Sequence, residues 1–251
     1  MNLDGATALV TGAAHRLGRE IALGLADAGA DVAITYRSRA EAAEATVQDL
    51  VARGVRACAV PLDLADGDRC DEVVAEVTER LGPIDVLVNN ASAFAPTPFP
   101  TDDHTGWYAT FDVVLHGPYR LANAVAPSMV ERGRGSIVDI VDLSAWHPWP
   151  DRGAHAVAKA ALLALTRQLA VELAPAVTVN AVAPGPTIPA ESFDAAQIDR
   201  LARRNLAGRW GDPAQVVAAV RFLAESDFVT GECITIDGGE RWGHVRQRFA
   251  D

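Results

Sequence analysis

The sequence predicts a doubly wound α/β fold, in which one parallel sheet carries helices on both faces. Short runs rich in Val and Ile alternate with longer periodic segments along all 251 residues, and 49% of the residues are apolar. Runs of this kind are typical of strands buried on both sides, whereas the periodic segments are typical of helices with one apolar face. Their regular alternation favours strand–helix–strand crossovers within one sheet.

The order of these elements runs from one end of the chain to the other. The predicted strands are residues 7–10, 31–36, 56–60, 84–88, 136–141, 177–182 and 233–236. The predicted helices are residues 16–29, 39–53, 66–81, 104–132, 153–174 and 213–224. Because no Pro-rich, Ser-rich or low-complexity segment divides the chain, we expect residues 1–251 to form a single Rossmann-type domain with about seven strands.

Composition limits the classes of partner. The chain has 33 acidic and 22 basic side chains and a formal charge of −11, which argues against nucleic acid or an anionic membrane surface as partner. A predicted strand begins at residue 7 and there is no apolar run long enough to span a bilayer, so we expect a cytoplasmic protein without a signal peptide. Three scattered cysteines, Cys58, Cys70 and Cys233, form no C-x-x-C pair, which favours a reducing compartment and no metal site.

A glycine turn follows the first predicted strand. It reads Thr11-Gly12-Ala13-Ala14-His15-Arg16-Leu17-Gly18, and a helix follows it. Gly12 allows a tight turn and Gly18 allows close packing of helix and strand, while the first N–H groups of the helix are free to bind a pyrophosphate. The position between strand and helix makes a dinucleotide site, with His15 and Leu17 beside it, a better interpretation than a turn without a ligand.

Basic residues indicate which dinucleotide this turn binds. The second strand ends in Tyr36-Arg37-Ser38-Arg39 and lacks the Asp or Glu that would bind a ribose 2′-hydroxyl. Because guanidinium groups pair well with phosphate, Arg16, Arg37, Ser38 and Arg39 together predict a 2′-phosphate clamp, and therefore NADP(H) in preference to NAD(H). The alternative is that Arg37 and Arg39 only solvate the start of the next helix.

Residues 142–159 contain a second candidate site. Lys159 is the only lysine of the chain and begins an alanine-rich stretch that is apolar nearly all round, so it needs a polar partner. His155 precedes it by one helical turn and shares its face. Asp142 follows the strand 136–141, at the sheet edge where ligand-binding side chains gather. The alternative is a lysine and a histidine solvated at the start of a helix.

Further motifs follow the other strands in order. Asp63-Leu64 follows the third strand, Asn89-Asn90-Ala91-Ser92 the fourth, and Pro184-Gly185-Pro186-Thr187 the sixth, while Gly231 and Asp237-Gly238-Gly239 flank the last. With the glycine turn and Lys159, this set resembles the short-chain dehydrogenase/reductase family over essentially the whole chain. The resemblance implies a cofactor site that includes Asp63, Leu64, Asn90, Ala91, Ser92, Lys159, Pro184, Gly185, Thr187 and Ile188.

Within that family, the chain most resembles the pteridine reductases. The similarity lies in Arg16 of the glycine turn, in Ser92 and Phe94 after the fourth strand, and in Asp142 at the position of the family's serine. It implies that Phe94 stacks on a flat substrate ring, although Phe94 also fits a core aromatic role. The expected substrate residues are Phe94, Asp142, Trp146 and Trp149, with Ile188 and Phe193 as further pocket walls.

The chain departs from the family pattern at two catalytic positions. His155 takes the place of the tyrosine that transfers the proton, and Val114 that of the asparagine. Histidine is a chemically reasonable substitute, because its ordinary pKa of about 6.5 lies nearer neutrality than the value of about 10 for tyrosine. A neutral His155 would favour alcohol oxidation and a cationic one reduction. Asp142 and His147 are the alternative proton donors.

The resemblance implies an NADP(H)-dependent oxidoreductase with Asp142, His155 and Lys159 as catalytic residues. Its substrate would carry a C=O or C=N on a small planar or apolar molecule, with a pteridine as one option. Two alternatives remain: an NADP(H)-binding sensor or scaffold with a decayed proton relay, and a non-redox dehydratase or isomerase. The apolar helices 153–174 and 104–132 resemble the family's dimer helices and indicate a homo-oligomer, either a dimer or a tetramer.

Overall fold

The computed structural model describes residues 1–243 and contains the predicted seven-stranded parallel sheet. The strands are β1 (Thr7–Val10), β2 (Asp31–Tyr36), β3 (Ala57–Pro61), β4 (Val86–Asn89), β5 (Gly135–Ile140), β6 (Val177–Pro184) and β7 (Cys233–Ile236). Their order is β3-β2-β1-β4-β5-β6-β7, and every neighbouring pair is parallel. The doubly wound fold is thereby confirmed, and the predicted strand bounds shift by only one or two residues at most ends.

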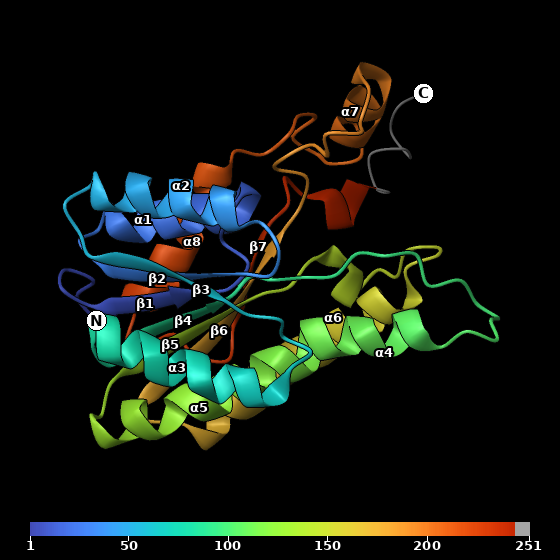
Figure 1. Ribbon diagram of the computed structural model, residues 1–251. Helices are drawn as coiled ribbons and strands as arrows, with labels where there is room; N and C mark the ends of the chain where they lie inside the picture. The colour runs from blue at the N-terminus through green and yellow to red at the C-terminus, as the bar shows by residue number, and fades with distance from the viewer. Residues whose placement is uncertain (244–251) are drawn as a thin grey trace.

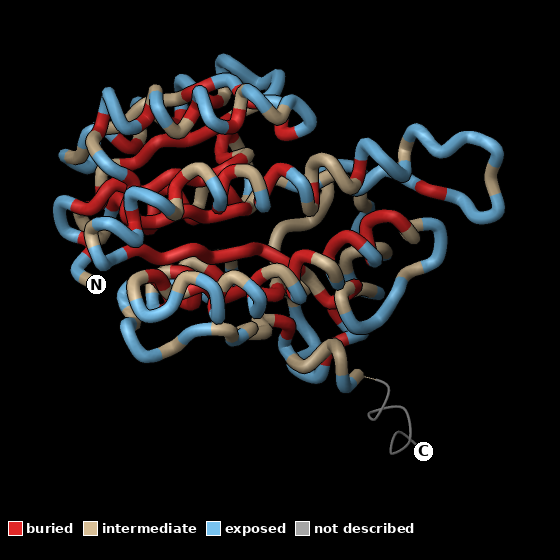
Figure 2. The backbone as a smooth tube through the Cα atoms, turned by 90° about the horizontal axis from the view of Figure 1, so that it is seen from below, coloured by how far each residue is buried: buried red, intermediate tan, exposed pale blue. Residues whose placement is uncertain are grey.

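Helices cover both faces of the sheet (Figure 1). One face packs against α1 (Arg16–Ala26), α2 (Ala40–Val51) and α8 (Pro213–Glu225). The other packs against α3 (Gly67–Leu81), α5 (Gly117–Glu131) and α6 (Gly153–Glu172). The five inner strands run as buried segments through the middle of the molecule (Figure 2), which explains why their sequences are apolar on both sides, whereas the edge strands β3 and β7 are mostly half-buried.

The segment predicted as one helix, 104–132, is helical but not uniform. It consists of α4 (Thr105–Phe111), a π-helical turn η1 (Asp112–His116) and α5. Val114 lies in this turn and is completely buried. A π-turn changes the direction of the side chains that follow it and often occurs near functional sites.

The structure also contains helical segments that the sequence analysis did not predict. They are η2 (Leu143–Ala145), α7 (Ala195–Ala202) and η3 (Glu240–Trp242). A readable signal for α7 was present, because Asp194 and Gln197 form a capping box at its start. Within residues 1–243, no helix combines the length and the apolarity that crossing a bilayer requires.

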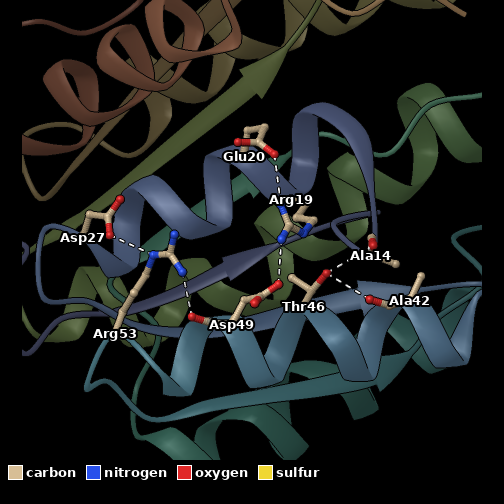
Figure 3. A network of polar contacts seen from close by, with 8 residues as sticks. All are labelled: Ala14, Arg19, Glu20, Asp27, Ala42, Thr46, Asp49 and Arg53. Carbon is tan, nitrogen blue, oxygen red and sulfur yellow. Dashed lines mark hydrogen bonds and ion pairs between the residues drawn. The ribbon is translucent and has the colours of Figure 1, made fainter.

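Polar contacts hold α1 against α2 and so position the glycine turn that leads into α1. Figure 3 shows this network, in which Arg19 pairs with Asp49 at 2.6 Å. Thr46 on α2 is buried, and its Oγ1 donates to the backbone oxygen of Ala14 in the turn at 3.2 Å. The single proton of this hydroxyl is shared with the backbone oxygen of Ala42 at 2.9 Å, so the contact with the turn and the partly exposed ion pair each contribute modestly.

The close packing of Gly18 yields the first prediction. A Cβ at this position would lie 2.4 Å from Asn90 Nδ2 and 2.7 Å from the carbonyl oxygen of Gly12. We expect Gly18→Ala to lower the free energy of unfolding in urea by about 1–3 kcal/mol, because the turn and β4 must move apart.

The matched control is Gly106→Ala in α4. A Cβ there meets its nearest atom at 3.7 Å, an ordinary contact distance. Alanine is the better helix former by about 0.5–1 kcal/mol, so this variant should be at least as stable as the parent protein. Equal stability of the two variants would contradict the packing account.

Candidate active site

A cavity of about 630 Å³ lies at the carboxyl edge of the sheet, beside the ends of β5 and β6. Of the residues predicted to bind cofactor, those that line it are Arg16, Leu17, Asn90, Ser92, Lys159, Pro184, Gly185, Thr187 and Ile188. Those that do not line it are Gly12, His15, Gly18, Arg37, Ser38, Arg39, Asp63, Leu64 and Ala91. The strand order changes direction between β1 and β4, which is where open parallel sheets bind their ligands.

The glycine turn lies directly against the end of β4. Gly12 has a φ of +63°, and a Cβ there would lie 3.0 Å from Ala91. Asn90 Nδ2 donates to the backbone oxygen of Thr11 at 2.8 Å, and the backbone N–H groups of Asn90 and Ala91 both donate to Thr11 Oγ1 at 3.0 Å. These bonds leave the outer side of the turn as bare backbone, as close approach of a pyrophosphate requires.

The start of α1 offers donors and positive charge. No side chain caps this helix and no acidic residue lies in its first turn, whereas Asp66 caps α3 and Asp212 caps α8. His15 Nδ1 is buried without a hydrogen-bond partner among the described residues. Burial lowers the pKa of His15, and the nearby charges of Arg39 and Arg16 lower it further. This arrangement fits an anionic group.

Arg16 contacts the segment after β6. Its guanidinium donates to the carbonyl oxygens of Ile188 at 2.8 Å and Pro189 at 3.1 Å, in the segment after β6. Arg37, Ser38 and Arg39 lie exposed after β2, as a clamp at the outer end of the site requires. Asp63 is exposed after β3, and Leu64 beside it is buried against the protein. Arg16 and Arg39 both lie near His15, and the 2′-phosphate clamp of Arg16, Arg37, Ser38 and Arg39 stays a prediction.

Asp142, His155 and Lys159 meet, as their spacing predicted. His155 Nε2 lies 2.6 Å from Asp142 Oδ2, and His155 Nδ1 lies 2.8 Å from the backbone oxygen of Ala93. Lys159 Nζ donates to the backbone oxygen of Ile140 at 2.5 Å. Both α6 side chains are buried, each with 3% exposure, and Asp142 and Lys159 line the cavity while His155 lies behind its wall.

The hydrogen-bond partners of Asp142 and His155 indicate which atoms of the two side chains carry protons. A carbonyl oxygen only accepts, so His155 Nδ1 carries a proton toward Ala93. Asp142 Oδ1 accepts from the backbone N–H of Ser144 at 2.8 Å and from the Ser144 hydroxyl, so it carries none. The 2.6 Å contact therefore holds one proton between Nε2 and Oδ2. Burial raises the pKa of Asp142, but its bond to His155 and the Lys159 charge outweigh burial and hold that pKa below the usual value. The proton accordingly lies on Nε2.

Below this cluster is a buried carboxyl group that the sequence analysis did not single out. Asp139 on β5 is 1% exposed and accepts from Asn89 Nδ2 at 2.8 Å and from Thr166 Oγ1 at 2.7 Å. Burial raises its pKa, although these bonds and the Lys159 charge oppose the rise. Burial also lowers the pKa of Lys159, against the opposing effect of Asp142 and Asp139. Lys159 therefore interacts with two carboxyl groups: that of Asp142, whose pKa is lowered, and that of Asp139, whose pKa is raised.

Aromatic side chains form one wall of the cavity. Phe94 meets His155 edge to face at 4.9 Å between ring centroids and Trp149 at 5.9 Å. Phe94 and Trp149 line the cavity, as expected of substrate residues, and 53% of Phe94 is exposed, so it is not a core aromatic. Trp146, predicted beside them, lies outside the lining and is 39% exposed.

The cavity has a further wall that the sequence analysis only partly located. Phe193 was expected there and does line the cavity, whereas the unpredicted lining residues include Arg152, Leu201, Arg204, Trp210 and Glu240. Several of these come from α7 and the segments around it. The capping box at Asp194 was the one signal that would have placed a helix there.

Asp139 gives a prediction with a defined dependence on pH. Below a pH of about 4 the group is protonated in both folded and unfolded protein. As the pH rises, the unfolded chain releases this proton first, because burial raises the pKa in the folded state. Asp139→Asn mimics the protonated acid, so its stability relative to the parent should increase above about pH 4 and level off once the native pKa is passed.

The measurement is urea unfolding of both proteins at a series of pH values. A stability difference independent of pH would contradict the raised pKa. Asp112→Asn, on an exposed pair with His116 at 2.9 Å, is the matched control and should show no such rise.

Comparison with known proteins extends these observations. A family model described as Enoyl-(Acyl carrier protein) reductase matches residues 12–240. The 3-oxoacyl-[acyl-carrier-protein] reductase of Synechocystis is 34% identical over 241 residues, covering 94% of this chain and 97% of that protein.

Solved structures show the same similarity. FolM alternative dihydrofolate reductase 1 from Brucella canis, complexed with NADP, superposes with a TM-score of 0.90 at 34% identity, covering 96% of each chain. A gluconate 5-dehydrogenase from Burkholderia cenocepacia, in complex with NADP and tartrate, gives a TM-score of 0.87 at 34% identity, covering 95% of this chain and 96% of that one. With the sheet order, the glycine turn and Lys159 at the carboxyl edge, these matches establish that the chain belongs to the short-chain dehydrogenase/reductase family.

Proposed function

We propose that the protein is an NADP(H)-dependent oxidoreductase that reduces a C=O or C=N bond of a small planar substrate. The observation that supports this most is the Asp142–His155 pair, which holds one proton at the wall of the cavity beside Lys159. A pteridine-like ring is the proposed substrate type, because Phe94 and Trp149 line the same cavity and a FolM reductase is among the similar structures.

The residues present fit the cofactor. The bare turn at Gly12 and the uncapped start of α1 would hold the pyrophosphate, and the unpartnered His15 Nδ1 lies beside them. Arg37, Ser38 and Arg39 would hold the 2′-phosphate, with Asp63 and Leu64 toward the adenine. Pro184, Gly185, Thr187 and Ile188 would flank the nicotinamide, and Lys159 would bind its ribose. Bound there, the cofactor supplies the hydride.

The chain's own residues supply the proton. Asp142 faces the cavity and therefore touches the reacting oxygen or nitrogen, while His155 lies behind it and holds the proton on Nε2. As negative charge develops on the substrate atom, the proton shared with His155 moves to Asp142 Oδ2 and from there to the substrate atom, which leaves a neutral imidazole protonated on Nδ1 and an Asp142 carboxylate. Lys159 stabilises the carboxylate and the developing charge, because its cation lies in a buried site. A pair that begins protonated favours reduction over oxidation.

A second candidate is an NADP(H)-binding sensor without turnover. Two observations favour it: Val114 replaces the family's asparagine with a buried apolar group, and both ring nitrogens of His155 bond to the protein itself. Tight NADPH binding without NADPH consumption, across a panel of aldehydes, ketones and dihydropterins, would identify this function.

We propose that the protein acts in the cytoplasm, as one domain per chain within a homo-oligomer. Exposed apolar side chains on two neighbouring helices support the assembly, namely Tyr119 on α5 with Val157 and Val171 on α6. A dimer and a tetramer both agree with this surface.

The cofactor preference is tested by binding. We expect NADPH to bind more tightly than NADH, and Arg39→Gln to weaken NADPH binding by about 10-fold while leaving NADH unchanged, because only NADPH has the phosphate that a guanidinium binds. Dissociation constants from protein fluorescence measure both. NADH binding equal to or tighter than NADPH binding would reject the clamp.

The proton relay is tested by paired histidine variants. His155→Phe keeps an aromatic ring beside Phe94 but removes the proton, so kcat should fall by about 10²–10⁴-fold with little change in NADPH affinity. His147→Phe alters an exposed loop histidine and should keep the parent rate. An unchanged rate in the first variant, or the larger loss in the second, would mean that His155 is not part of the relay.

A further inference from the structure

Arg152 immediately precedes α6 and lies on the wall of the cavity. Among the described residues, no carboxylate forms an ion pair with it. The backbone around it is fixed: Thr97 N–H donates to the backbone oxygen of Asp151 at 2.9 Å, and Thr97 Oγ1 accepts from the N–H of Ala154 at 3.1 Å. Arg152 lines the cavity and is half-buried. The hydrogen bonds on either side of Arg152 therefore fix its position.

The guanidinium of Arg152 is held but not neutralised. Its Cζ lies 4.7 Å from the centroid of the Phe94 ring, and Nη1 donates to the backbone oxygen of Asp151 at 3.0 Å. Nε is buried without an acceptor, and within residues 1–243 no carboxylate lies within ion-pair distance. A half-buried cation with most of its donors unused is costly unless a ligand or water satisfies it.

The other cations on the cavity wall have partners. Arg16 donates to two backbone carbonyls, Arg204 pairs with Glu240 at 3.3 Å, and Lys159 donates to Ile140. Within the described residues, Arg152 is the basic residue of the lining that has a buried nitrogen, Nε, without an acceptor.

We propose that Arg152 binds an oxyanionic group of the substrate, a carboxylate or a phosphate, at the end of the molecule remote from the reacting bond. The planar part of that substrate lies along Phe94 and Trp149, which line the same cavity. The proposal rests on the proposed function only for the identity of the reacting bond, because the anion site is defined by Arg152 and Phe94 themselves.

The geometry favours an oxyanion over a neutral polar group. Hydrogen bonds from a guanidinium to a carboxylate or phosphate are charge-assisted and roughly twice as strong as those between neutral groups. Nη1 donates to Asp151 and Nε is buried, so Nη2 is the donor that remains for a ligand in the cavity. The guanidinium lies over the face of the Phe94 ring, which limits its motion and reduces the ordering that binding requires.

The test measures binding without turnover. The probes are 4-formylbenzoate and 3-(4-formylphenyl)propanoate, each beside its methyl ester, and 4-formylphenyl phosphate. Titration calorimetry on the full chain, with and without NADP⁺, gives each dissociation constant. We expect at least one anion to bind about 10-fold more tightly than its neutral counterpart, and a comparison of carboxylate with phosphate identifies the group.

Three variants locate the effect. Arg152→Gln should abolish the preference for the anion, and Arg152→Lys should restore only part of it, because an ammonium on a flexible stem is more strongly hydrated and lacks the planar contact with the Phe94 ring. Arg200→Gln is the matched control: it removes an exposed arginine of α7 that does not line the cavity, so the preference should remain. Asp151→Asn, at a residue with φ of +57° that asparagine tolerates, should leave or strengthen anion binding.

The outcomes separate the two proposals. The absence of an anion preference in the parent protein, its survival in Arg152→Gln, or an equal loss in Arg200→Gln would overturn the Arg152 site. An Arg152-dependent preference without NADPH consumption would support the site and count against the reductase function. NADPH consumption with no anion preference would support the reductase function and overturn the Arg152 site.

Discussion

The hydrogen bond between Asp142 and His155, 2.6 Å long, joins the end of β5 to the first turn of α6 and determines how the catalytic side of the cavity is built. It fixes the Asp142 carboxylate at the cavity wall and keeps the imidazole behind it, where Nδ1 is tied to the loop after β4 through Ala93. Lys159, one turn further along α6, is stabilised as a buried cation by this carboxylate. Removing any of the three groups would leave a buried charge or donor without a partner, so they act as one unit.

The cofactor side of the cavity is built on a different principle. There the backbone does most of the binding: Gly12 and Gly18 are packed so closely against Ala91 and Asn90 that no side chain fits. The start of α1 is left without a cap, and positive charge is supplied from the exposed segment after β2. The proton-transfer residues that we propose and the proposed dinucleotide site therefore depend on different parts of the chain, and one can change without the other.

Much of this could be read from the sequence, and the exceptions have physical causes. Apolar runs and glycine turns are local signals, so the sheet, its order of elements and the meeting of Asp142 with Lys159 were predictable. The orientation of His155 was not, because it depends on the carbonyl of Ala93, about sixty residues away along the chain and offering no side-chain signal. The contacts of Arg16 were not predictable for the same reason: its partners are the backbone oxygens of Ile188 and Pro189. A role for Arg152 was not predictable either, because its lack of a carboxylate partner depends on the tertiary structure.

The central claim is that one proton lies between His155 Nε2 and Asp142 Oδ2 while Nδ1 remains protonated toward Ala93. Proton and nitrogen NMR of protein labelled with ¹⁵N at the histidine side chains tests it directly, since both ring nitrogens report whether they carry hydrogen. The account predicts a hydrogen on Nδ1 and a strongly downfield proton in the contact between Nε2 and Oδ2, which disappears in Asp142→Asn. A His155 ring without hydrogen on Nδ1, and no such downfield signal, would contradict it.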